Sequence, residues 1–250
     1  MKKVLIFFSL MMLFVACSSD DNNPVINEPD KPDPVQPANK YPNELVGVWE
    51  FYSGNPVAVL SAINENDILN HTFTFVANGN MNEAIVHPDR NKQGETISAY
   101  GNWLVENKQL KLTDWQGNVI GGNCSYKINA DSSLTLTISG KTAVYYKQVE
   151  IKKKYPALIV SRWNSLRQDD GRERMSFYSN NTGCFETYYK NGFYNGRGDF
   201  TWSYNNNVIT AIYKDRASSI ATEEYEINYL NMKSISWTFK NNTVHYTREQ

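Results

Sequence analysis

The chain has 250 residues, of which 20% are charged and 13% aromatic, and its formal net charge is −1. Without a basic excess, it does not look like a nucleic-acid-binding protein that relies on electrostatics. Three cysteines are too few for a scaffold built from disulfides, and the length allows one or two domains.

The chain begins with the pattern of a secretion signal. Two lysines precede an apolar run over residues 4–15, which is too short for a membrane span of about 20 residues. Residues 1–16 are therefore predicted to be a signal peptide. The run ends in Phe14-Val15-Ala16-Cys17, which resembles a bacterial lipobox. The resemblance implies that Cys17 becomes the acylated N-terminus and anchors the protein in a membrane. An ordinary signal peptide with an incidental cysteine is the alternative.

Residues 17–43 are predicted to form a disordered stalk that begins with Cys17. The acidic stretch Ser18-Ser19-Asp20-Asp21-Asn22 resembles the surface-export signal of Bacteroidetes lipoproteins. This implies an outer-membrane lipoprotein exposed at the cell surface, with a periplasm-facing position as the alternative. Six prolines and a single aromatic residue follow before residue 44, so the segment cannot bury enough apolar surface to fold.

From residue 44 onward, short runs of alternating apolar and polar residues lie between turn-forming residues. Residues 71–76 and 134–138 are examples, and Asn, Gly and Asp cluster between such runs. This pattern is typical of half-buried antiparallel strands joined by tight turns.

Four segments of the first half recur in the second half at offsets of 97, 99, about 101 and 100 residues. The pairs are Gly101-Asn102-Trp103 with Gly198-Asp199-Phe200, residues 126–129 with 225–228, residues 134–138 with 234–239, and Val144-Tyr145-Tyr146 with Val244-His245-Tyr246. Nearly constant offsets indicate two copies of one β-rich unit.

The two units are predicted at residues 44–150 and 158–250. The lysine-rich joint at residues 151–156 is predicted to be a solvated linker. Trp49 and Trp163 would be equivalent although they lie 114 residues apart, because the first unit holds extra residues between Trp49 and Phe75. The apolar part of this insertion is either a short amphipathic helix that caps the unit or a surface loop.

The first unit opens with Gly47-Val48-Trp49, which matches the Gly-x-Trp motif of lipocalin-type barrels. Together with the order of its later motifs, it resembles the small lipocalin-like domains of Bacteroidetes lipoproteins. The resemblance implies an all-β chain with two tandem lipocalin-like antiparallel up-and-down β-barrels of about eight strands each. It also implies a cation over each opening tryptophan, Lys147 over Trp49 and Arg248 over Trp163, which would close the barrels.

The sequence holds no motif for catalysis, and no cofactor or metal site is expected. Its three histidines are scattered, and no nucleophile elbow or phosphate-binding loop occurs. The acidic pairs Asp169-Asp170 and Glu223-Glu224 are interpreted as turns or exposed strand ends, because neighbours in a strand point to opposite faces. Cys124 and Cys184 are expected to be buried free thiols, with a bridge across the two units as the alternative.

The second unit is especially rich in rings, and six of them form the candidate ligand or partner surface: Tyr188, Tyr189, Phe193, Tyr194, Trp202 and Tyr204. The alternative is that these rings fill the barrel. We expect a non-catalytic envelope lipoprotein that binds a small apolar molecule or a glycan. The alternative function is a structural protein that docks another envelope protein through this aromatic-rich unit.

Overall fold

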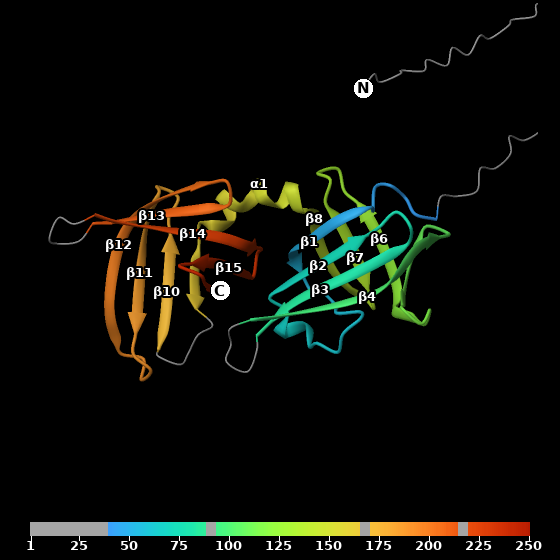
Figure 1. Ribbon diagram of the computed structural model, residues 1–250, viewed down its shortest axis with the longest axis horizontal. Coiled ribbons are helices and arrows are strands. Elements are labelled where there is room, and N and C mark those ends of the chain that lie inside the picture. The colour runs from blue at the N-terminus through green and yellow to red at the C-terminus, as the bar shows by residue number, and fades with distance from the viewer. Residues whose placement is uncertain (1–39, 89–93, 166–170, 215–219) are drawn as a thin grey trace, which may run out of the picture. The chain divides into compact units, whose positions relative to one another are not determined.

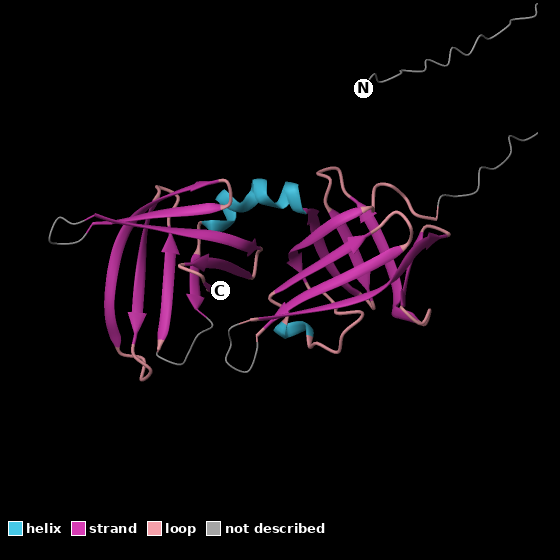
Figure 2. Ribbon diagram, in the orientation of Figure 1, coloured by secondary structure: helices cyan, strands magenta, loops and turns pink. Residues whose placement is uncertain are grey.

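The structure is a computed structural model that describes residues 40–88, 94–165, 171–214 and 220–250 (Figure 1). Strands dominate these residues, as the magenta arrows of Figure 2 show. The predicted signal peptide (1–16), the predicted lipid attachment site Cys17 and most of the predicted stalk (17–43) lie outside the described residues.

The first barrel contains eight strands in chain order. They are β1 (Gly47–Gly54), β2 (Asn70–Phe75), β3 (Asn80–His87), β4 (Glu95–Glu106), β5 (Gln109–Asp114), β6 (Val119–Ile128), β7 (Leu134–Ile138) and β8 (Lys141–Lys147). Each strand pairs antiparallel with the next, and β8 pairs with β1, which closes the barrel. A single 3₁₀ turn, η1 (Glu65–Asp67), lies between β1 and β2.

The second barrel repeats this plan. Its strands are β9 (Arg162–Ser165), β10 (Arg172–Phe177), β11 (Thr182–Tyr188), β12 (Tyr194–Asn205), β13 (Val208–Lys214), β14 (Ile220–Leu230), β15 (Ser234–Phe239) and β16 (Asn242–Arg248). β16 pairs with β9 and closes the barrel. The prediction of two tandem antiparallel up-and-down barrels is therefore confirmed.

A helix, α1 (Gln148–Ile159), connects the barrels, so the prediction of a solvated linker at residues 151–156 was wrong. Ile151, Tyr155 and Leu158 recur at helical spacing and are buried, while Lys152 and Lys153 remain exposed. The helix packs against β1, β8 and β14. No helix of the described residues is long and apolar enough to cross a membrane.

The folded body begins before the predicted boundary at residue 44. The backbone N–H of Val105 donates to the carbonyl of Lys40 over 2.8 Å. The ring of Tyr41 packs edge-on against Trp103, with 5.5 Å between ring centroids. These contacts join the last residues of the predicted stalk to the first barrel.

The hydrogen bonds of two tryptophans correct one pair of the sequence repeat. The indole N–H of Trp103 donates to the carbonyl of Val76 over 2.9 Å, and that of Trp202 donates to the carbonyl of Tyr178 over 3.2 Å. The counterpart of Trp103 is therefore Trp202, at an offset of 99, and not Phe200. Phe200 shares the inward face of β12 with Trp202 but lies two residues earlier.

Candidate functional site

The interior of the first barrel is filled with side chains. Alternate residues of its strands point inward, and Phe51, Phe73 and Tyr145 are almost completely inaccessible to solvent. Among these rings lies one carboxylate, that of Glu83, which is only 1% exposed. A buried carboxylate is costly unless hydrogen bonds satisfy it.

The insertion between β1 and β2 satisfies the Glu83 carboxylate and covers the interior. The backbone N–H groups of Val59 and Leu60 donate to its two oxygens over 2.8 and 2.7 Å, and His71 Nε2 lies 2.9 Å from Oε1. The side chains of Val59 and Leu60 pack against the core of the barrel. The insertion therefore covers the barrel, although its apolar part forms no helix.

The second barrel has no comparable insertion and contains a cavity of about 470 Å³. Only residues 166–171 separate β9 from β10, whereas residues 55–69 separate β1 from β2. Six aromatic side chains line the cavity: Phe185, Tyr213, Tyr225, Trp237, Phe239 and Tyr246. Gly198 and Ala221 also face it, and their small size leaves room between the rings.

Two carboxylates, those of Glu173 on β10 and Glu223 on β14, add polar groups to this aromatic wall. The hydroxyl of Tyr225 donates to Glu223 Oε2 over 2.5 Å, and the hydroxyl of Tyr246 donates to Glu173 Oε2 over 3.4 Å. The hydroxyls of Tyr213 and Tyr225 lie 3.2 Å apart.

Burial keeps the hydroxyls of Tyr213 and Tyr225 protonated. It raises the pKa of Tyr213 to about 12 and lifts the pKa of Tyr225 far above its ordinary range. These hydroxyls are therefore neutral hydrogen-bond donors at neutral pH. Among the described residues, no lysine, arginine or histidine lines the cavity, so its fixed charge comes from the carboxylates.

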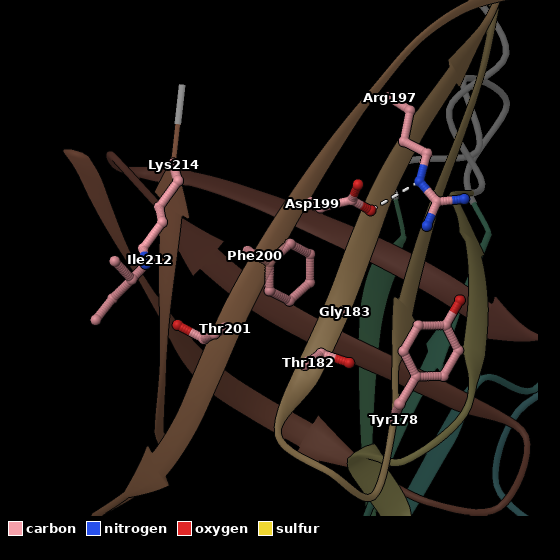
Figure 3. Close-up of a pocket in the computed structure, with 9 residues that line it drawn as sticks. All are labelled: Tyr178, Thr182, Gly183, Arg197, Asp199, Phe200, Thr201, Ile212 and Lys214. Carbon is pink, nitrogen blue, oxygen red and sulfur yellow. Dashed lines mark hydrogen bonds and ion pairs between the residues drawn. The ribbon is translucent and has the colours of Figure 1, made fainter. Parts of the chain in front are cut away.

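A second hollow of about 410 Å³ lies on the outer face of β11, β12 and β13 (Figure 3). Arg197 and Asp199 face outward on β12, and the guanidinium donates to the carboxylate over 2.7 Å. The ring of Tyr178 lies on one side of this groove, and Ile212 and Lys214 lie on the other (Figure 3). The groove is open to solvent, and its Arg197–Asp199 pair is exposed.

The structure divides the six rings of the predicted surface between two ends of β12. Tyr188 and Tyr194 pack edge-on at the β11–β12 hairpin, with centroids 5.8 Å apart, and Tyr189 and Phe193 are exposed beside them. Because Arg172 pairs with Tyr188, this hairpin lies at the same end of the barrel as Glu173 in the cavity wall.

The other two predicted rings do not belong to this surface. Trp202 is eight residues beyond Tyr194 on β12, or roughly 26 Å along an extended strand. It is buried, and its indole N–H donates to the carbonyls of Tyr178 and Thr182. Tyr204 packs near Tyr155 of α1.

Each opening tryptophan lies under a cation from the last strand of its barrel. Lys147 Nζ is 5.3 Å from the ring centroid of Trp49, and the guanidinium carbon of Arg248 is 4.8 Å from that of Trp163. Such contacts contribute about 0.5–2 kcal/mol. Both indoles also donate to the carbonyl four residues earlier, over 2.7 and 3.0 Å.

Sequence reasoning missed the residues of the cavity. Glu223 was interpreted as part of a turn or an exposed strand end, but it faces the cavity, whereas Glu224 beside it is exposed. The alternation of residues along β14 could have identified Glu223 as facing inward. Tyr225 and Ile227 are buried apolar residues on the same face of this strand as Glu223. Asp169-Asp170 lies outside the described residues.

The remaining candidate groups take no part in this cavity. Cys124 and Cys184 are buried free thiols. In the described ranges of the chain, no group of three or more His, Cys, Asp and Glu side chains could hold a metal ion.

No protein-family model and no curated protein matches the chain. Two chains among the solved structures match it. One is the crystal structure of a lipocalin-like protein from Bacteroides uniformis, which is 12% identical, has a TM-score of 0.27, and covers 37% of this chain and 98% of that chain. The closed antiparallel strand pairing of each barrel defines the fold.

Proposed function

We propose that this protein is a non-catalytic envelope lipoprotein whose second barrel binds a small, largely apolar molecule. The observation that supports this proposal is the contrast between the barrels. The first is filled and covered by its own insertion, whereas the second keeps an aromatic-walled cavity of about 470 Å³. Ligand pockets commonly measure about 300–1,000 Å³ and combine apolar walls with a few polar groups.

The non-catalytic role and the location are supported by the sequence alone. No nucleophile elbow, zinc-binding helix or phosphate loop occurs. The lipobox-like residues before Cys17 and the acidic stretch after it support lipid anchoring in the outer membrane and exposure at the cell surface. No nucleic-acid partner is proposed.

Fluorescence titration of the full-length chain with the neutral apolar dye N-phenyl-1-naphthylamine tests the binding function. Ala221 lines the cavity at an exposed position, so the large ring introduced by Ala221→Trp should obstruct the cavity. Ile212 faces outward on β13, and Ile212→Trp is the matched control. We expect Ala221→Trp to abolish dye binding and Ile212→Trp to preserve it. Equal affinity of the wild-type protein and Ala221→Trp would refute binding in the cavity.

The same pair of variants tests whether a glycan binds in the outer groove. The ring of Tyr178, the hydroxyls of Thr182 and Thr201 and the charges of Arg197 and Asp199 supply the stacking and hydrogen-bonding groups that a sugar uses. A glycan in this groove would be displaced by Ile212→Trp and unaffected by Ala221→Trp, which is the reverse of the result expected for the dye.

Docking of another envelope protein is the second candidate function. Tyr189, Phe193 and Tyr194 are each more than half exposed on the β11–β12 hairpin, and exposed rings are enriched in protein interfaces. Replacing all three with serine should then release a partner that co-purifies with the wild-type chain, without changing dye binding. Loss of dye binding with retention of every partner would contradict this function.

A further inference from the structure

We infer that the ligand of the second barrel is an organic cation, with an amine or quaternary ammonium group on an apolar body. This inference rests on the proposed binding function and specifies its ligand class. Three features of the cavity support it: its charge, its rings, and the contrast with the carboxylate inside the first barrel.

The fixed charge of the cavity favours a cation. Glu173 and Glu223 line it from opposite parts of the strand order, β10 and β14. Within the described part of the chain, neither carboxylate forms an ion pair with a lysine, arginine or histidine. Arg172 and Arg174, which flank Glu173 in the sequence, instead lie over the ring of Tyr188, at 4.8 and 5.7 Å from its centroid. A ligand that enters this cavity therefore meets negative charge, which opposes anions and attracts cations.

The rings of the cavity are suited to the same ligand. The faces of tryptophan, tyrosine and phenylalanine attract cations, and cages of such rings bind quaternary ammonium groups. Tyr225 and Trp237 pack with centroids 5.5 Å apart, and Trp237 and Tyr246 pack with centroids 4.5 Å apart, so these walls are held in place by one another. Tyr225 and Tyr246 also orient the carboxylates through their hydroxyls.

The first barrel shows how this chain satisfies a carboxylate that faces a barrel interior. There, two backbone N–H groups of the insertion donate to both oxygens of Glu83. The second barrel lacks such an insertion, and its two carboxylates receive tyrosine hydroxyls at one oxygen each. The ammonium group of a bound amine carries N–H donors like those that the insertion supplies in the first barrel, and a quaternary ammonium group would offer positive charge in their place.

The test compares three ligands that share one apolar body: 4-phenylbutylamine, 4-phenylbutan-1-ol and 4-phenylbutyrate. Each is titrated into the full-length chain at pH 7 by isothermal calorimetry. We expect the amine to bind about ten- to a hundredfold more tightly than the alcohol, as one charge-assisted hydrogen bond implies, and the carboxylate to bind most weakly.

Two cavity variants and one matched control locate the effect. Glu223→Gln and Glu173→Gln each remove one charge from the cavity, and both should reduce the preference for amine over alcohol without weakening the alcohol. Glu224→Gln removes the same charge from the exposed neighbour of Glu223 and should leave the preference unchanged. Using two separate cavity variants keeps the test decisive if one of them fails to fold.

The outcomes separate this inference from the proposed function. Equal affinity for the amine and the alcohol, or tighter binding of the carboxylate, would refute the inference that the ligand is a cation. Neither result would contradict binding in the cavity. A preference for the amine that survives in both cavity variants would also refute the cation class. If none of the three ligands binds but Ala221→Trp still abolishes dye binding, only the cation class is refuted. If Ala221→Trp leaves dye binding unchanged, the proposed binding function is refuted as well.

Discussion

Glu50 provides a quantitative prediction about the contact between the first barrel and α1. Its carboxyl group lies on β1 and is almost fully buried, and the hydroxyl of Tyr155 donates to it over 3.5 Å. Burial raises the pKa of Glu50 from 4.5 to about 7, although Lys152 and hydrogen bonds from Tyr155 and Asn70 oppose the shift. The folded state therefore favours the protonated carboxyl group.

The sign and size of the effect on stability follow from this shift. Between pH 4.5 and about 7 the folded chain holds a proton at Glu50 that the unfolded chain has lost, so stability falls as pH rises. The contribution is fully present below pH 4.5 and is lost as pH rises through 7. Each unit of pKa corresponds to 1.36 kcal/mol, so the loss amounts to about 3 kcal/mol.

Urea unfolding at pH 5 and pH 8 measures this contribution. Glu50→Gln keeps a neutral side chain of similar shape at every pH. The variant should therefore match the wild-type protein at pH 5 to within about 1 kcal/mol and exceed it at pH 8 by about 2–3 kcal/mol. Glu226→Gln, at an exposed position of β14, is the control and should leave the pH dependence unchanged. If Glu50→Gln and the wild-type protein lost stability equally between pH 5 and pH 8, the reasoning would be refuted.

Two further predictions concern the first barrel and the N-terminus. Glu83→Ala removes the hydrogen-bond partner of Val59, Leu60 and His71. The variant should therefore have a free energy of unfolding about 3–5 kcal/mol lower in urea denaturation. A loss below about 1 kcal/mol would contradict the role of this carboxylate in holding the insertion. Cys17→Ser should abolish incorporation of labelled fatty acid and release the protein from the membrane fraction, and retention of the label in the variant would exclude Cys17 as the lipid attachment site.

The barrels could be predicted from the sequence because their pattern is local. Alternation over segments such as residues 71–76 depends on neighbouring residues alone, and it correctly predicts strands with one buried face. The Gly-x-Trp motif is likewise a local pattern. Its resemblance to lipocalin-type barrels predicted a cation over Trp49, and Lys147 lies over this ring in the structure.

The helix between the barrels was missed because two local signals conflicted. The lysine run and Pro156 are typical of a linker, and proline costs a helix one hydrogen bond. The spacing of Ile151, Tyr155 and Leu158 favours a helix, and burial of this face against the strands decided the outcome.

The cavity could not be predicted because it depends on which residues from seven strands meet after closure. Glu223 and Glu224 are neighbouring residues of the same type. They differ only in which face of β14 they occupy, so that Glu223 lines the cavity and Glu224 is exposed to solvent. Whether a barrel is filled also depends on a distant segment. The insertion at residues 55–69 covers the first barrel, and the second barrel has no comparable segment between its first two strands.

The number of dye molecules bound per chain distinguishes a ligand cavity in one barrel from cavities in both, because the two barrels differ in having room for a ligand. Calorimetric titration with N-phenyl-1-naphthylamine should give one site per full-length chain in the wild-type protein and in Ile212→Trp, and none in Ala221→Trp. Two sites in the wild-type protein, or one site that persists in Ala221→Trp, would contradict the assignment of the ligand cavity to the second barrel alone.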